Sequence, residues 1–279
     1  MLGYTLPQKK RKTIMEELDL MNDKITAAIN KKVALANTSV WQYGLRAIFA
    51  GIYLGIGCGV AFMTAEQISA VHPDLGRFAY ALLFPWCLVM IIFLNGELTT
   101  SNMMYFANGL YRKVVKPADA AKVLALCTLF NLIGCVAIAW VLSQTLGFND
   151  IDASHYLISA VQGKIDKSYG LVFLDGIVAN MLVNITVIGI MFMKDNSTKI
   201  PYILGIIFIF AFYGFEHVIA NFVTYSLAAF TLPSAIEGFT LSHVLLQWLV
   251  AWLGNFVGGG VVMGIGYGFL NKGQDIYTD

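Results

Sequence analysis

Six long apolar runs, separated by shorter polar segments, make up most of this chain. They lie at residues 45–65, 78–111, 119–146, 169–193, 201–230 and 243–271. An α-helix needs about 20 largely apolar residues to cross the hydrocarbon core of a bilayer. Each run is long enough, so the pattern predicts an all-α polytopic membrane protein with six transmembrane helices.

The second and fifth runs are each interrupted near the middle by polar residues. The second contains Asn95-Gly96-Glu97-Leu98-Thr99-Thr100, and the fifth contains Gly214-Phe215-Glu216-His217. At membrane depth, backbone leaves the helix only where it is buried in protein or lines a cavity. Carboxylates and imidazoles at that depth normally face a bundle interior or a water-filled pathway. The pattern therefore predicts that the second and fifth helices are broken beside a pathway.

The two interruptions fall at matching places, in the second of three runs in each half of the chain. The third run carries Asn131-Leu132-Ile133-Gly134, and the sixth carries Asn255-Phe256-Val257-Gly258. Three spans per half is an odd number, so the two halves must be inverted relative to one another. Paired broken helices in inverted repeats point to a substrate site at the repeat interface.

The N-terminal segment, residues 1–40, is polar and precedes a membrane domain at 41–271 and a short tail at 272–279. Apolar residues at three- and four-residue steps predict an amphipathic helix from Thr13 to Ile29, lying at the membrane surface or packed under the bundle. With six spans, 15 Lys and Arg residues fall on the side that holds both termini and three fall on the other. This bias predicts a multi-pass protein of the cell membrane with both termini in the cytoplasm.

Composition narrows the possible functions. The chain is 58% hydrophobic and 13% charged, with a formal net charge of +1, which argues against a nucleic-acid partner. Its four cysteines lie in apolar runs without Cys-x-x-Cys spacing, so neither a disulfide framework nor a metal site is expected. We find no phosphate-binding loop, nucleotide fingerprint or nucleophile–base pairing, and therefore expect no enzyme and no cofactor.

His217 is the only histidine inside a predicted span, and it is either a proton carrier in a pore or a hydrogen-bonded core residue. His72, His155 and His243 fall outside the spans or at their ends, where we expect them to be solvated or interfacial.

Glu97 and Glu216 are expected to support the broken helices, most simply by capping exposed backbone amides. Lys164 is expected in a loop, as a solvated residue or as an anion-attracting residue at a vestibule. Asp175 is either a packed residue or the partner of a lysine.

These motifs resemble the formate/nitrite transporter family, which also includes hydrosulfide channels. The resemblance covers residues 40–271 and rests on motifs in the second to sixth spans. They are Gly96-Glu97-Leu98-Thr99-Thr100-Ser101, Asn131-Leu132-Ile133-Gly134, Lys164 with Gly176-Ile177-Val178-Ala179-Asn180, Gly214-Phe215-Glu216-His217-Val218-Ile219-Ala220-Asn221, and Gly254-Asn255-Phe256-Val257-Gly258-Gly259-Gly260.

The resemblance implies an aquaporin-like six-helix protomer, assembled as a homopentamer with one pore per protomer. By position, His217 is similar to the central pore histidine, Thr100 to the threonine of the loop in the second span, and Lys164 to a lysine at the external slit. The implied constriction residues and pore-lining asparagines are Phe84, Leu88, Leu98, Phe210, Asn180 and Asn221. Thr99 stands where formate channels have an aromatic residue, so it is expected to line the pore and influence its width.

The function implied by the resemblance is transport of the small monovalent anions of weak acids, namely formate, nitrite or hydrosulfide, moved with a proton as the neutral acid. An anion channel with a cationic His217 is the alternative mechanism. A water or neutral-solute channel would share the inverted repeat, but it should carry paired Asn-Pro-Ala motifs that this chain lacks. A membrane enzyme binding haem or a metal should carry paired intramembrane histidines, and only His217 is in a span.

Overall fold

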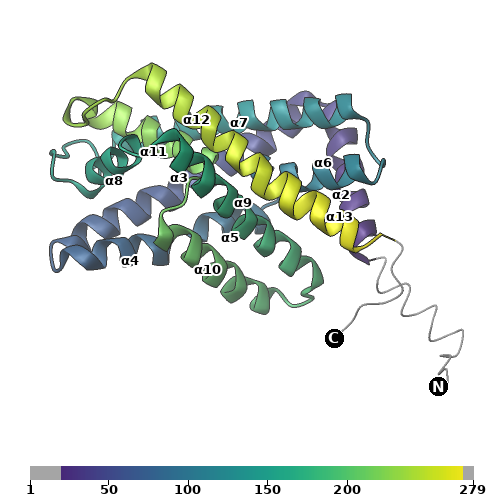
Figure 1. Ribbon diagram of the computed structural model, residues 1–279. Coiled ribbons are helices and arrows are strands. Elements are labelled where there is room, and N and C mark those ends of the chain that lie inside the picture. The colour runs from purple at the N-terminus through teal and green to yellow at the C-terminus, as the bar shows by residue number, and fades with distance from the viewer. Residues whose placement is uncertain (1–19, 273–279) are drawn as a thin grey trace, which may run out of the picture.

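The computed structural model describes residues 20–272, which fold as helices without any strand in that part of the chain (Figure 1). The helices are α2 (Leu20–Thr38), α3 (Val40–Ser69), α4 (Pro73–Leu83), α5 (Trp86–Phe93), α6 (Thr99–Tyr111), α7 (Pro117–Ser143), α8 (Tyr156–Ile165), α9 (Tyr169–Phe192), α10 (Asn196–Tyr213), α11 (Val218–Thr231), α12 (Leu241–Asn255) and α13 (Gly266–Leu270). A 3₁₀ turn, η1 (Pro233–Ala235), follows α11, and a π-helical stretch, η2 (Phe256–Ile265), joins α12 to α13.

Six segments of the described chain are long and apolar enough to cross a membrane, as predicted. They are Val40–Ser69, Asp74–Phe93, Pro117–Ser143, Tyr169–Phe192, Asn196–Tyr213 and Leu241–Leu270. The second and fifth spans are broken where the sequence predicts: the chain leaves the helix at residues 94–98 before α6 and at residues 214–217 before α11.

Both breaks contain a residue in left-handed backbone near their start, Asn95 with φ 54° and Gly214 with φ 69°. Such backbone disfavours most side chains, but it is tolerated by glycine and by asparagine. The two breaks therefore contain the same local backbone conformation, adopted by asparagine in one half and by glycine in the other.

The first and third spans of each half pack closely enough to require glycine at equivalent points. A Cβ built on Gly134 of α7 would lie 2.2 Å from the carbonyl oxygen of Ile48 in α3. A Cβ on Gly258 in η2 would lie 2.0 Å from the carbonyl oxygen of Ile177 in α9. The inverted three-helix repeat is thus visible at the level of single contacts, and Figure 1 shows the sixth span, drawn in yellow, alongside α9.

The N-terminal amphipathic helix differs in extent from its prediction. Residues 13–19 lie outside the described residues, and α2 continues past Ile29 to Thr38. Met21, Ile25 and Ile29 are buried against α3, α6 and α7, so the described part of the helix packs against the bundle.

A short helix that the sequence analysis missed, α8, lies between the third and fourth spans. The prediction that Lys164 lies in a loop is therefore wrong, because Lys164 is in the last turn of this helix. His155 is not solvated as one of its two alternatives predicted: the residue is 8% exposed, and its Nδ1 accepts a hydrogen bond from the backbone N–H of Leu157, 3.1 Å away. A histidine cap thus fixes the start of the helix that presents Lys164.

Candidate functional site

An asparagine from the third span of the first repeat holds the break in the second span. The Oδ1 atom of Asn131 accepts the backbone N–H of Thr99 at 3.0 Å, which caps the start of α6. Its Nδ2 donates to the carbonyl oxygens of Ala47 and Glu97, both at 2.8 Å. One fully buried amide therefore bonds two backbone groups of the break, the N–H of Thr99 and the carbonyl of Glu97, and ties them to the carbonyl of Ala47 in α3.

Asn255 makes the same contacts at the break in the fifth span. Its Oδ1 accepts the backbone N–H of Val218 at 2.9 Å, and its Nδ2 donates to the carbonyl oxygens of Gly176 and Glu216 at 2.8 and 2.9 Å. Asparagines, and not the glutamate carboxylates, thus cap these amides. The expectation of carboxylate capping is corrected, although both glutamates take part in the breaks through their backbone carbonyls.

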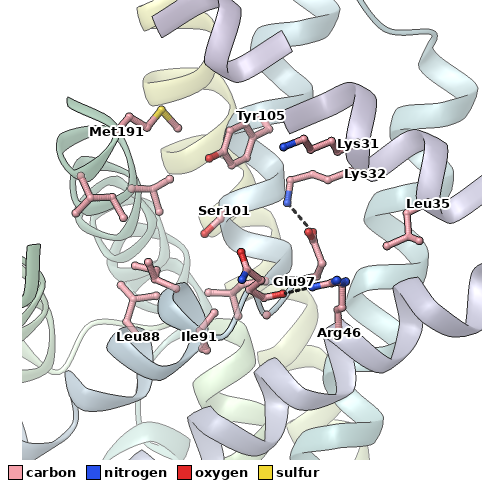
Figure 2. A pocket seen from close by; sticks show the side chains of 16 residues that line it. Lys31, Lys32, Leu35, Arg46, Leu88, Ile91, Glu97, Ser101, Tyr105 and Met191 are labelled. Carbon is pink, nitrogen blue, oxygen red and sulfur yellow. Dashed lines mark hydrogen bonds and ion pairs between the residues drawn. The ribbon is translucent and has the colours of Figure 1, made fainter. Parts of the chain in front are cut away.

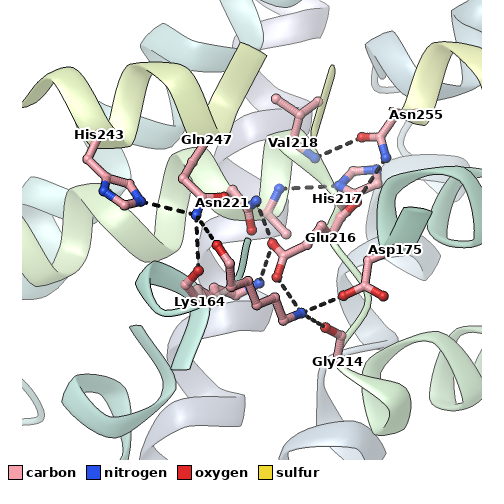
Figure 3. Close-up of polar contacts among 12 residues, drawn as sticks. Lys164, Asp175, Gly214, Glu216, His217, Val218, Asn221, His243, Gln247 and Asn255 are labelled. Atoms are coloured by element: carbon pink, nitrogen blue, oxygen red, sulfur yellow. Dashed lines mark hydrogen bonds and ion pairs between the residues drawn. The ribbon is translucent and has the colours of Figure 1, made fainter. Parts of the chain in front are cut away.

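The carboxylate of Glu216 is fully buried and receives three donors (Figure 3). Its Oε2 lies 2.8 Å from Lys164 Nζ and 2.8 Å from Asn221 Nδ2, and its Oε1 lies 2.7 Å from Lys167 Nζ. Lys167 also pairs with Asp175 Oδ2 at 2.7 Å, so Asp175 is the partner of a lysine. Charge pairing and hydrogen bonds together allow a buried carboxylate to stay ionised.

Glu97 has a matching set of partners in the first repeat. Its Oε2 accepts from Lys32 Nζ at 2.6 Å, from Asn102 Nδ2 at 3.1 Å and from the Tyr43 hydroxyl at 3.4 Å. Asn102 follows Glu97 by five residues, as Asn221 follows Glu216. The sequence analysis missed Lys32, which comes from α2 and reaches a partner 65 residues away.

His217 and Thr100 meet between the two breaks. The Nε2 atom of His217 lies 2.8 Å from the Oγ1 atom of Thr100, and its Nδ1 accepts the backbone N–H of Ala220 at 3.2 Å. Because Nδ1 is an acceptor, a neutral imidazole carries its proton on Nε2 and donates it to Thr100. His217 is 3% exposed and Thr100 is fully buried, so the pair is shielded from bulk water.

The fourth span fixes the backbone of Thr100. The Nδ2 atoms of Asn180 and Asn184 donate to the carbonyl oxygen of Thr100 at 3.0 and 3.3 Å, and that of Asn180 also donates to the carbonyl oxygen of Asn255 at 2.7 Å. Space for these amides comes from Gly259, where an added Cβ would lie 2.1 Å from Asn180 Nδ2. Asn180 and Asn221 are fully buried and position Thr100 and Glu216, respectively.

Three cavities lie around the His217–Thr100 pair. The proximal cavity, named for its position near the described chain ends, has a volume of 670 Å³ and is lined by Lys31, Lys32 and Arg46 among others (Figure 2). The distal cavity, on the other side, has a volume of 360 Å³ and is lined by Lys164 and Lys167 among others. Between them lies a central cavity of only 20 Å³, lined by His217 and otherwise by apolar side chains and Cys87.

Apolar side chains separate the central cavity from the other two. Phe84 and Phe210 line both the distal and the central cavity, with ring centroids 5.6 Å apart. Leu88 and Leu98 line both the proximal and the central cavity. The arrangement is an apolar duct with a single titratable ring inside and basic residues at both mouths.

Comparison with known proteins identifies the family to which this chain belongs. Residues 20–269 match the sequence profile of the family described as "Formate/nitrite transporter". The chain belongs to this family. It is therefore a multi-pass membrane channel or transporter for small anions, and not an enzyme.

Relatives and solved structures agree with the assignment. The transporter is 28% identical over 247 residues to a Bacillus subtilis (strain 168) protein named "Uncharacterized transporter YwcJ", covering 88% of this chain and 95% of the relative. It is similar in fold to a solved "FNT family ion channel", with a TM-score of 0.84 and 23% identity over 90% of this chain and 98% of the other. A "Pentameric formate channel with formate bound" matches with a TM-score of 0.70 and 20% identity, covering 84% and 98% of the two chains.

The side chain of the transporter's Thr99 does not point into the pore, contrary to expectation. Its hydroxyl lies 3.2 Å from that of Thr128 on α7, which in turn accepts from Trp252 Nε1 at 3.3 Å. Thr99 is fully buried and is not among the residues that line the three cavities described above. This geometry favours a packing role for Thr99.

The remaining histidines lie at the periphery. His72 is exposed at the start of α4, and half-buried His243 lies 3.3 Å from Gln247 Nε2 on α12. Among the described residues, no group of three or more His, Cys, Asp or Glu side chains is arranged to hold a metal ion.

Proposed function

We propose that this transporter moves formate, nitrite or hydrosulfide together with a proton, so that the species crossing the central cavity is the neutral acid. The observation that carries the proposal is the position of His217, which is hydrogen-bonded to Thr100 and lines a cavity of 20 Å³ closed by apolar side chains on both sides. Moving a bare carboxylate-sized ion into such a medium costs on the order of 20 kcal/mol by an idealised Born estimate. A neutral acid avoids nearly all of that cost.

The first step is capture of the anion at a mouth. Lys164 lines the distal cavity and Lys32 lines the proximal cavity, each bound to a glutamate of a broken helix. Positive groups in a low-dielectric cleft raise the local concentration of anions. The glutamates keep the lysines in place through their carboxylates.

Protonation follows as the anion loses water between the apolar side chains. Leaving water disfavours the charged form of a weak acid, so its proton affinity rises as it enters the duct. The proton comes from the water of the mouth or through His217, which lines the central cavity and is hydrogen-bonded to Thr100. At the other mouth the acid ionises again, and net movement is electroneutral.

Two further properties complete the proposal. A solved formate channel of the same fold is described as pentameric, which supports a homopentamer with one duct in each protomer. The excess of Lys and Arg on the side of the termini supports a position in the cell membrane with both termini in the cytoplasm.

Flux measurements in proteoliposomes test the function. Formate, nitrite and hydrosulfide are compared side by side, with a pH-sensitive dye inside the vesicles and a potassium diffusion potential applied or absent. We expect at least one permeant to acidify the interior as it enters, at a rate independent of the potential. Uptake that follows the potential without acidification would support a charge-carrying anion channel instead, and osmotic water flow without anion flux would support a neutral-solute channel.

A further inference from the structure

The two lysines of the distal cavity have different numbers of partners. Lys167 Nζ contacts three acceptors: Asp175 Oδ2 at 2.7 Å, Glu216 Oε1 at 2.7 Å and the carbonyl oxygen of Gly214 at 2.9 Å (Figure 3). An ammonium group has three N–H donors, so Lys167 has none left for a permeant. Gly214 carries the left-handed backbone of the break, which Lys167 therefore holds in place.

Lys164 retains donors that face the cavity. Among the described residues, its Nζ atom has one acceptor, Glu216 Oε2 at 2.8 Å. Its backbone carbonyl is held by Gln247 Nε2 at 3.1 Å, so the chain that presents it is fixed. Both lysines line the distal cavity, but Lys164 is the one with N–H groups available to an anion.

The net charge at the distal mouth depends on Asp175. Lys164 and Lys167 are matched by Glu216 and Asp175, while Arg77 lines the same cavity and donates to the carbonyl oxygen of Tyr213 at 2.7 Å. This group of five charged side chains thus has a formal excess of one positive charge. Without Asp175, the excess would be two.

We propose that Asp175 is a positioning residue that sets the charge of the distal mouth: it holds Lys167 on the break in the fifth span, limits the positive excess, and leaves Lys164 as the residue that meets the incoming anion. This inference deepens the proposed function and rests on it. It assigns separate tasks to two lysines that are three positions apart and line one cavity.

The first test is Asp175→Asn, which keeps the shape of the side chain and removes its charge. Formate uptake into proteoliposomes is measured from low to high ionic strength. At ~10 mM salt, where charges act over ~30 Å, we expect about a threefold increase in uptake over the parent. At ~1 M salt, where the screening length is ~3 Å, parent and variant should converge.

A paired variant separates charge from structure. Lys167→Met removes the excess charge and the contacts at the break, so uptake at low salt should fall below that of the parent and the melting temperature should drop. Lys167→Met combined with Asp175→Leu restores the excess to one charge, so the salt dependence should return to that of the parent while the melting temperature stays low.

Each result decides between the explanations. If Asp175→Asn lowers the melting temperature but leaves the salt dependence of the parent unchanged, Asp175 acts only in packing and the inference is overturned. If the double variant keeps the salt dependence of Lys167→Met, charge balance is not the cause and the inference is likewise overturned. If the parent protein transports none of formate, nitrite and hydrosulfide, the proposed function itself is wrong. That outcome differs from one in which the parent is active and the variants show no change in salt dependence.

Discussion

Asn131 and Asn255 perform the same task in opposite halves of the molecule. Each accepts the first backbone N–H of a half-helix and donates to two carbonyl oxygens, one of them from the glutamate of the break. Both side chains are fully buried, so bulk water does not compete for these bonds. The two breaks are therefore held by the same pattern of hydrogen bonds from a buried asparagine.

Replacing Asn131 or Asn255 by Leu should destabilise the protein more than any single change in a mouth. Each substitution leaves the first N–H of a half-helix buried without its acceptor, at about 1–3 kcal/mol, and removes a donor from two buried carbonyl oxygens. Thermal melting in detergent measures the loss, with Asn149→Leu on the exposed α7–α8 connection as the matched control. A melting temperature equal to that of the control variant would show that the asparagines do not support the breaks.

Replacing His217 by Phe should leave the fold in place and abolish proton-coupled uptake. The variant keeps a ring in the central cavity but loses the imidazole that bonds Thr100. Uptake and internal acidification are followed between about pH 5 and pH 8, the range in which an unperturbed imidazole titrates. A variant that acidifies vesicles at the rate of the parent throughout this range would remove His217 from the mechanism.

Lys164→Ala should lower anion uptake and weaken its dependence on ionic strength, because an attracting charge at a mouth acts at long range. The matched control is Lys194→Ala, which removes an exposed lysine that does not line the cavities described above. Equal uptake and equal salt dependence in the two variants would mean that Lys164 serves only as the ionic partner of Glu216.

Thr99→Phe should reduce stability and leave selectivity unchanged. Thr99 is fully buried beside Thr128, so a phenyl ring there overpacks the contact with α7, at about 1–3 kcal/mol. We would measure the melting temperature and the ratio of formate to hydrosulfide flux, with Thr99→Val as the conservative control. An altered flux ratio at an unchanged melting temperature would show instead that this side chain faces the duct.

Much of this architecture is readable in the sequence because its signals are local. Apolar length marks the spans, and the polar residues at Glu97 and Glu216 mark the breaks within three residues of their true ends. The matching Asn131 and Asn255 motifs indicate the repeat, since their positions relative to the breaks do not depend on knowing the fold.

The features that sequence analysis missed depend on contacts between distant segments. Lys32 becomes a partner of Glu97 only after α2 folds under the bundle. The direction of Thr99 depends on how α6 is rotated against α7, and a shift of one residue along a helix moves a side chain by about 100°. The π-helical stretch in the sixth span has no distinctive composition beyond its glycines, which also fit close packing of regular helices.

The amide of Asn180 has a mechanical consequence. Its Nδ2 donates hydrogen bonds to the carbonyl oxygens of Thr100 and Asn255. Thr100 follows the break of the first repeat, and Asn255 holds the break of the second repeat. Rocking one repeat against the other would pull these buried bonds apart at the centre of the protein, where no solvent could compensate for them. We therefore expect the two repeats to stay fixed relative to one another during transport, with any opening or closing confined to the mouths.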